Sequence, residues 1–244
     1  MPEVIDYKSL AMPDFNAMAF AGATLESNAQ IREREWLKRR LGKFTASQFS
    51  KLMTYPSKNE LPAGAITYIM EKVVEVATDF EPEQGFTSAA IQWGKDHELE
   101  AVERFSESFL LNVDFTGDAQ QFIDYPLLRA GATPDGLIDS YAGLEVKCPN
   151  SATHLSYMAI KNADDLKRIA PNYYWQVMGS LMITGRDQWF FCSYDPRFKD
   201  ENLQLHTISV EPVLADIEFL KERLSMAKDY FEQVCNYRGI NHAA

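Results

Sequence analysis

The chain has few cysteines and no long apolar run. Its three cysteines (Cys148, Cys192 and Cys235) are odd in number and widely spaced along 244 residues, which is typical of reduced thiols rather than of a disulfide frame. Without a cluster of cysteines and histidines, structural zinc is not expected. No run of about 18 apolar residues indicates a membrane span, and the first residues have neither the basic start nor the apolar stretch of a signal peptide. We therefore expect a cytoplasmic protein with no membrane partner.

The chain also lacks a positive excess. Its formal net charge of −11 argues against a protein that coats nucleic acid indiscriminately. The charge is nevertheless uneven, because residues 31–58 hold eight basic and two acidic side chains, whereas residues 59–125 hold fourteen acidic and three basic ones. Two interpretations of the basic segment remain open at this point: a solvated helix face, or a basic entrance for DNA on a body that otherwise repels it.

Repeats, low-complexity tracts and Gly/Ser-rich linkers are absent as well. Apolar residues make up 46 % of the chain and charged residues 24 %, which is ordinary for a folded protein. We expect one domain over residues 1–244, with residues 1–27 as an irregular arm.

Hydrophobic periodicity places strands in the middle of the chain and helices on both sides of them. Helices are expected at 28–41, from Thr45 or Ser47 onward, and at 65–78, 88–111, 171–184 and about 212–236. Strands are expected at 112–116, 120–124, 128–133, 136–140, 143–148, 187–194 and 203–210. This order predicts an α/β fold of mixed α+β type, with a central mixed β-sheet flanked by helices.

The most informative segment is residues 131–150. Asp135 is followed after nine residues by Glu145, and then by Lys147, within two short strands around a Ser140–Gly143 turn. Side chains alternate along a strand, so Glu145 and Lys147 share one face while Val146 points into the core. Two carboxylates are hard oxygen ligands for Mg²⁺, which activates water and polarises a phosphate, while a lysine orients the water or offsets negative charge. The alternative is an exposed hairpin whose charges only face solvent.

The helix around Trp93 carries a further acid. Glu98 lies near the inward face of this helix, and a carboxylate that points partly inward needs a partner such as a metal. The spacing also allows Glu98 to pair with Lys95 or Arg104 at the surface.

Arg40 and Ser47 form a candidate phosphate site. A helix that begins at Thr45 presents free backbone N–H groups, and Arg40 adds a planar donor that holds a phosphate with two hydrogen bonds.

These motifs together resemble a known family. The segments Arg40-Leu41-Gly42-x-x-Thr45-Ala46-Ser47, Trp93-Gly94-x-x-x-Glu98, Pro134-Asp135-Gly136, Leu144-Glu145-Val146-Lys147-Cys148-Pro149, Tyr174-x-Gln176-Val177 and Tyr194-Asp195-Pro196-Arg197 occur in the order seen in the lambda-exonuclease family. That family comprises the YqaJ-type viral recombinase nucleases of the PD-(D/E)xK superfamily, and the resemblance covers about residues 30–200.

The resemblance implies a restriction-endonuclease-like fold and an alkaline-type, Mg²⁺-dependent 5′→3′ exonuclease, with Mn²⁺ as a substitute ion. Such an enzyme acts on double-stranded DNA ends, releases mononucleotides and leaves a 3′ single-stranded tail for homologous recombination. A phage or prophage origin, a homotrimer ring and a single-strand-annealing recombinase partner in a bacterial host cell are implied in the same way.

The resemblance also implies roles for individual residues. Glu98, Asp135, Glu145 and the backbone carbonyl of Val146 would bind the metal, Lys147 would be the catalytic lysine, and Gln176 would hold that lysine or the water. Arg40 and Ser47 would bind the 5′-phosphate. Lys58 stands near the place of a second arginine of the family. It supplies the positive charge but not the planar guanidinium that binds a phosphate with two hydrogen bonds. Ile91 matches a side chain that wedges the strands apart, although a core position suits it equally well.

Two other functions stay open on the sequence alone. One is a structure-specific endonuclease on the same fold. The other is an inert module that binds DNA ends, against which the presence of Asp135, Glu145 and Lys147 counts.

Overall fold

The structure is a computed structural model, and it describes residues 27–54, 60–79 and 89–242. The side chains of residues 28–30, 32, 33, 90 and 91 are not described. The chain forms two compact units, residues 1–35 and 36–244. The described part of the first unit is the start of helix α2, Asn28–Arg40. Everything below concerns the second unit.

A four-stranded mixed sheet lies at the centre of this unit. Its strands are β4 (Gly136–Ile138), β5 (Ala142–Lys147), β6 (Gln188–Tyr194) and β7 (Leu205–Val210), in the order β4-β5-β6-β7. Strands β5 and β6 are parallel, and the other two pairs are antiparallel. The expected mixed sheet is therefore confirmed.

A second, smaller sheet is formed by three strands that precede β4 in the sequence. Its strands are β1 (Phe44–Thr45), β3 (Ala130–Ala132) and β2 (Ile123–Tyr125), in the order β1-β3-β2. Strand β1 runs parallel to β3, whereas β2 runs antiparallel to it.

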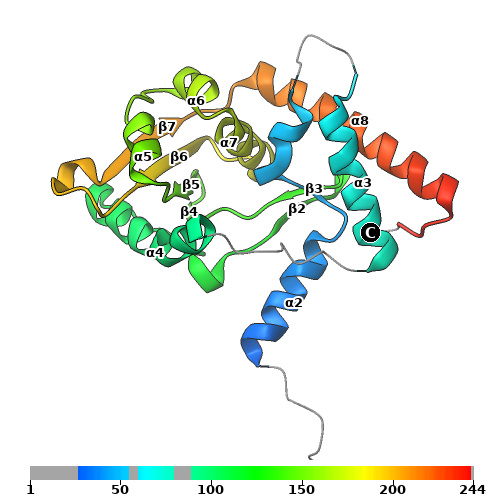
Figure 1. Cartoon of the computed structure of the whole chain (residues 1–244), viewed down its shortest axis with the longest axis horizontal. Coiled ribbons are helices and arrows are strands. Elements are labelled where there is room, and N and C mark those ends of the chain that lie inside the picture. Colours follow the sequence, from blue (N-terminus) through cyan, green and yellow to red (C-terminus); the bar gives the residue numbers. More distant parts are fainter. Residues whose placement is uncertain (1–26, 55–59, 80–88, 243–244) are drawn as a thin grey trace, which may run out of the picture. The chain divides into compact units, whose positions relative to one another are not determined.

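Helices cover both faces of the central sheet (Figure 1). Helix α4 (Ala89–Phe109) buries Val102 and Phe105 against Val146 and Tyr194 of one face. Helix α7 (Pro171–Thr184) packs on the other face, in the same core cluster as Phe191. Because neighbouring residues of a strand point to opposite faces, Glu145 and Lys147 lie on the α7 face.

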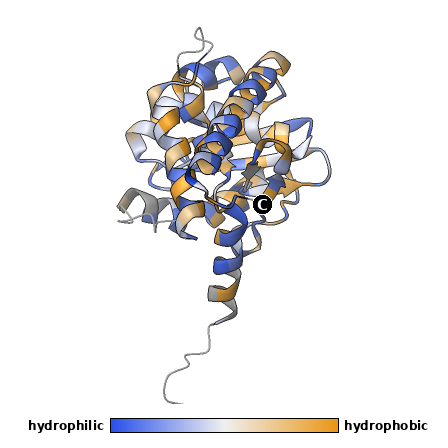
Figure 2. Ribbon diagram, turned by 90° about the vertical axis from the view of Figure 1, so that its right-hand side faces the viewer, coloured by the Kyte–Doolittle hydropathy of each residue, from blue (hydrophilic) through white to orange (hydrophobic). Residues whose placement is uncertain are grey.

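Helix α7 also packs against the 3₁₀ helix η2, Ala46–Leu52. A Cβ atom on Gly179 would lie 2.4 Å from the Phe49 ring, so this close approach requires glycine. Helices α3 (Ala63–Thr78) and α8 (Leu214–Arg238) pack against each other on the far side of η2. Blue and orange stretches alternate along the helices in Figure 2, as expected for helices with one buried face.

The structure departs from the sequence expectations in three places. Residues 112–116 form no strand and contribute only an isolated bridge between Asp114 and Leu137. The helix expected after Thr45 is of 3₁₀ type, and the short strand β1 that precedes it was not expected. Two helices were not expected: α5 (Ser151–Tyr157), capped by the Asn150 side chain, and α6 (Ala163–Ile169), capped by Asn162. Each spans only seven residues, too few for a clear hydrophobic period.

The remaining helices and strands lie within a few residues of the expected ranges. The C-terminal helix, for example, runs over Leu214–Arg238 rather than 212–236. None of the described helices is both long enough and apolar enough to cross a bilayer.

Candidate active site

The β4–β5 hairpin brings Asp135 beside Glu145 and Lys147. The turn consists of residues 139–141, with Asp139 in the left-handed region at φ 44°, so it begins one residue earlier than the expected Ser140–Gly143 turn. Asp135 precedes β4, and its Oδ2 accepts a hydrogen bond of 2.7 Å from the Val146 N–H. The Asp135 carboxylate is thereby fixed at the middle of β5.

Glu145 is fully buried and accepts two hydrogen bonds from side chains. Its Oε1 accepts one from Lys147 Nζ and another, of 2.5 Å, from Gln176 Nε2 on α7. Lys147 Nζ lies 3.7 Å from Asp135 Oδ2 as well, and the lysine side chain is 22 % exposed. The shared face expected for Glu145 and Lys147 is confirmed, and the alternative of a merely solvent-facing hairpin is wrong for Glu145.

Gln176 is buried on α7. The resemblance implied that it holds Lys147 or a water. In the structure its amide binds the carboxylate that Lys147 binds, and it therefore constrains the lysine through Glu145.

Burial and like charges shift the pKa values of this cluster. Burial raises the pKa of Glu145 to about 8, and the neighbouring Asp135 charge adds to the effect. Burial lowers the pKa of Lys147, but the charges of Glu145 and Asp135 outweigh burial and leave that pKa raised. Lys147 is therefore a cation, and Glu145 binds its proton more tightly than an exposed glutamate does.

Glu98 reaches this cluster from α4. Burial raises its pKa to about 7, and the charge of Asp135 raises it further, which places the two carboxylates near each other. Glu98 Oε1 accepts a 2.6 Å hydrogen bond from Gln120 Nε2. The alternative that Glu98 pairs with Arg104 is wrong, because Arg104 faces Glu107 and Glu201 instead. Lys95 acts on Glu98 only through its charge, which lowers the pKa of Glu98 slightly against the larger effect of burial.

A groove of about 740 Å³ opens along the cluster and is lined by Glu98, Val146 and Lys147. Arg197 closes one side of it. The Arg197 guanidinium stacks 4.2 Å from the Trp93 ring of α4, donates to the Pro149 carbonyl oxygen, and is held by the fully buried Asp195. This contact joins the helix of Glu98 to the chain just after Lys147.

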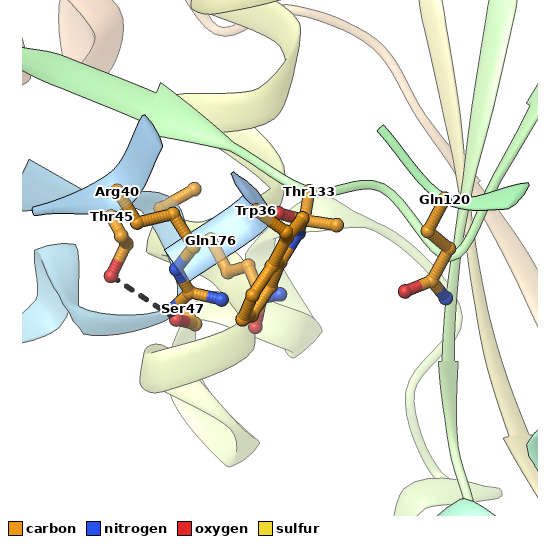
Figure 3. A pocket seen from close by; sticks show the side chains of 8 residues that line it. Trp36, Arg40, Thr45, Ser47, Gln120, Thr133 and Gln176 are labelled. Atoms are coloured by element: carbon orange, nitrogen blue, oxygen red, sulfur yellow. Dashed lines mark hydrogen bonds between the residues drawn. The ribbon is translucent and has the colours of Figure 1, made fainter. Parts of the chain in front are cut away.

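A second, smaller pocket of about 180 Å³ contains the candidate phosphate site (Figure 3). Arg40 and Ser47 both line it, and the Arg40 guanidinium stacks 3.9 Å from the Trp36 ring. Thr45 Oγ1 lies 3.5 Å from Ser47 Oγ. Gln176 lines the same pocket, so one glutamine borders both the phosphate site and the carboxylate cluster.

One detail of the phosphate site differs from expectation. The Thr45 N–H donates to the Tyr68 hydroxyl at 3.0 Å, so it is not among the free N–H groups of the helix start. Burial raises the pKa of Tyr68 far above its ordinary range, which keeps this hydroxyl neutral. Two expected contributors, Lys58 and the side chain of Ile91, lie outside the described residues.

The carboxylates fit a magnesium ion by their chemistry. Within the ranges that the structure describes, no three acidic, histidine or cysteine side chains are placed so that together they could hold a metal ion. Glu145 Oε2, however, is buried and has no hydrogen-bond partner among those residues, and an unpaired buried carboxylate oxygen needs a cation or a donor. Hard oxygen donors beside an open groove suit Mg²⁺, which keeps several waters and binds substrate phosphate.

Comparison with known protein families identifies the family of this chain. Residues 35–187 match the YqaJ-like viral recombinase domain. The chain belongs to the YqaJ-like viral recombinase family. No curated protein matches the sequence.

Several solved exonuclease structures are similar to this chain. LHK-Exo, an alkaline exonuclease from Laribacter hongkongensis, is 28 % identical with a TM-score of 0.71, and the match covers 84 % of this chain and 95 % of that one. LHK-Exo in complex with dAMP is 29 % identical with a TM-score of 0.70 over the same shares. A phage-related exonuclease from Haemophilus somnus 129PT shares the fold at 15 % identity and a TM-score of 0.64, with 80 % of this chain and 96 % of that one covered.

Several residues of this YqaJ-like site were not assigned a role from sequence. Trp36, Thr133 and Gln120 line the phosphate pocket, and Trp93 and Arg197 line the groove. Trp36 stands one helical turn before Arg40, a spacing that could have indicated their contact. Gln120 was expected to begin the strand at 120–124, but it lies before that strand, directly after a 3₁₀ turn, and strand periodicity does not predict its contact with Glu98.

The raised pKa of Glu145 predicts how stability depends on pH. A carboxyl group whose pKa rises from 4.5 to about 8 on folding binds its proton more tightly in the folded state, so its contribution weakens as pH increases across that interval. Glu145→Gln removes this titration. In EDTA, the free energy of unfolding of Glu145→Gln relative to wild type should therefore increase from pH 5 to pH 8, by up to about 1.4 kcal/mol per pH unit.

Urea unfolding at several pH values measures this difference. Glu211→Gln replaces an exposed glutamate outside the cluster and controls for the loss of one glutamate. A difference between Glu145→Gln and wild type that stays constant from pH 5 to pH 8 would contradict the assignment.

Proposed function

We propose that this chain is a Mg²⁺-dependent exonuclease that digests one strand of double-stranded DNA from its 5′ end. The observation that carries the proposal is that one side chain borders both the candidate phosphate pocket and the carboxylate cluster. Gln176 borders a pocket with an arginine and a serine, and it also holds the carboxylate that Lys147 binds. The exonuclease activity named for LHK-Exo supports the same reaction class.

Each residue of the cluster has a distinct task in this proposal. Glu98, Asp135 and Glu145, with the Val146 carbonyl, hold Mg²⁺. When bound, the ion polarises the scissile phosphate and makes water a better nucleophile. Lys147, kept cationic by its two acidic neighbours, orients the attacking water and offsets the charge that develops on the phosphate. Gln176 fixes Glu145 and thereby the lysine. Mn²⁺, which also takes oxygen ligands, serves as a substitute ion.

The small pocket supplies the selection for a 5′ end. Arg40 is preorganised by its stacking on Trp36 and presents a planar fork to the phosphate. The Ser47 hydroxyl adds a donor beside it. A terminal phosphate carries more negative charge than an internal one, so a site built from such donors favours the end of a strand.

Further properties rest on the family resemblance. The products are mononucleotides and a 3′ single-stranded tail for phage-type recombination, and a single-strand-annealing recombinase is the partner. A homotrimer ring suits an acidic protein, because only the channel of a ring needs to be basic while the outer surface repels other DNA.

Removal of the lysine should abolish most of the chemistry and leave the fold intact. Lys147→Ala is expected to reduce the single-turnover rate on linear duplex in Mg²⁺ by at least about 10²-fold, because it removes a group that acts on the reacting atoms. Lys161→Ala, at an exposed lysine outside the site, should keep the wild-type rate. A normally folded Lys147→Ala protein that digests linear duplex at the wild-type rate would refute the site assignment.

The phosphate pocket predicts a preference for phosphorylated ends. A charge-assisted contact contributes about 1.5–3 kcal/mol, so a 5′-phosphorylated duplex should be digested roughly tenfold to a hundredfold faster than a 5′-hydroxyl duplex. Arg40→Ala should remove most of this contrast. Rising salt should reduce it, because phosphate contacts are screened.

The control is Arg39→Ala, which removes an exposed arginine next to Arg40 in the same helix. It should preserve the contrast between the two kinds of end. Equal rates on both ends in the wild-type protein would remove the basis for the pocket.

A further inference from the structure

Gln120 lies where the two sites meet. Its amide donates to Glu98 Oε1 at 2.6 Å, and the same residue lines the pocket of Arg40 and Ser47. We propose that Gln120 is a positioning residue that holds Glu98 for the metal and couples metal binding to binding of the terminal phosphate. The proposal rests on the function proposed above.

The position of Gln120 makes it a specific support for Glu98. It follows the short 3₁₀ helix Gly117–Ala119, and its backbone N–H donates to the Gly117 carbonyl oxygen. This turn holds the half-buried side chain against a glutamate 22 residues earlier in the sequence. Among the described side chains of α4, His97 binds Glu100 and Gln92 binds Asp96, and Lys95 contributes a charge rather than a hydrogen bond to Glu98.

Glu98 needs such a donor because of its surroundings. It is partly buried, and the charges of Asp135 and Glu145 lie nearby, so repulsion tends to turn its carboxylate away from them. A hydrogen bond from a neutral amide stabilises the charged form and fixes one oxygen, which leaves the other free to bind a cation.

The two glutamines of the site act in parallel. Gln176 donates to Glu145 as Gln120 donates to Glu98, and both amides line the phosphate pocket. In Figure 3 Gln120 lies apart from Arg40, Ser47 and Gln176, at the other side of the pocket. An amide has two N–H donors, so in the proposed coupling Gln120 binds Glu98 through one of them and turns the other toward an anion in the pocket.

Coupling between the two ligands follows from this arrangement. A terminal phosphate that engages the second N–H restricts the amide, and a restricted amide holds Glu98 more firmly in place. The metal should then bind more tightly to the complex with a phosphorylated end, and by reciprocity the phosphorylated end should bind more tightly when the metal is present.

The test is calorimetric titration of Ca²⁺ into the full chain with bound duplex, because Ca²⁺ is expected to bind without productive turnover. Loss of such a supporting contact typically weakens metal binding by 10–100-fold, which is the change expected for Gln120→Ala. Gln121→Ala, an exposed glutamine at the next position, should stay within about twofold of wild type. Metal affinity of Gln120→Ala equal to that of wild type would overturn the proposal.

A second variant separates the hydrogen bond from packing. Gln120→Met keeps the length of the side chain and removes its donors, so it should bind Ca²⁺ as weakly as Gln120→Ala. Wild-type affinity in Gln120→Met would show that only packing matters and would overturn the proposed role. In a Glu98→Ala background, Gln120→Ala should cause no further loss, because its target is gone.

Two more readouts identify positioning and coupling. In single-turnover digestion, Gln120→Ala should shift the half-saturating Mg²⁺ concentration by 10–100-fold and keep the rate at saturating Mg²⁺ within a few fold of wild type. Wild-type protein should bind Ca²⁺ more tightly with a 5′-phosphorylated than with a 5′-hydroxyl duplex, and Gln120→Ala should lose this difference. If wild-type protein neither binds the metal nor digests DNA, the proposed function fails; if only the Gln120 variants behave as wild type, this inference alone fails.

Discussion

The buried carboxylate of Glu145 is the constraint on which the rest of this structure depends. A fully buried carboxylate is costly unless donors surround it, and here the donors come from Lys147 on the same strand and Gln176 on α7. The β4–β5 turn then places Asp135 beside the pair, where the charges of Glu145 and, to a lesser extent, Asp135 outweigh burial and keep Lys147 protonated. A chain selected only for stability would place an apolar residue there, so the charge at this depth indicates function.

Helix α7 connects this buried carboxylate to the proposed recognition of a DNA end. Gln176 faces the carboxylates, and Gly179, almost one turn later, lets the Phe49 ring of η2 approach the helix closely. The helix η2 carries Ser47, so the packing that closes the core also brings the phosphate pocket next to the catalytic cluster. A DNA end that places its terminal phosphate in this pocket is therefore positioned by the same helix that holds the reacting groups.

The β4–β5 hairpin was the part of the candidate site that the sequence predicted best. The two-residue period of a strand is enough to place Glu145 and Lys147 on one face, and the structure confirms that placement. The partner of Glu98 was not accessible, because Gln120 is distant in sequence and was expected to begin a strand, whereas in the structure the strand begins only at Ile123. The stacking of Arg197 on Trp93 depends likewise on tertiary packing between distant segments. Local patterns thus predict which residues share a face, whereas contacts between irregular segments require the folded chain.

The most direct test of the account compares linear duplex DNA that carries 5′-phosphates with covalently closed circular duplex of the same sequence, each with Mg²⁺ or with EDTA. We expect that the linear duplex is digested progressively from its 5′ ends in Mg²⁺ with release of mononucleotides, that the circle stays intact, and that EDTA stops the reaction. Cleavage of the closed circle would indicate an endonuclease. An intact linear duplex in Mg²⁺, or digestion that continues in EDTA, would contradict the proposed metal-dependent exonuclease.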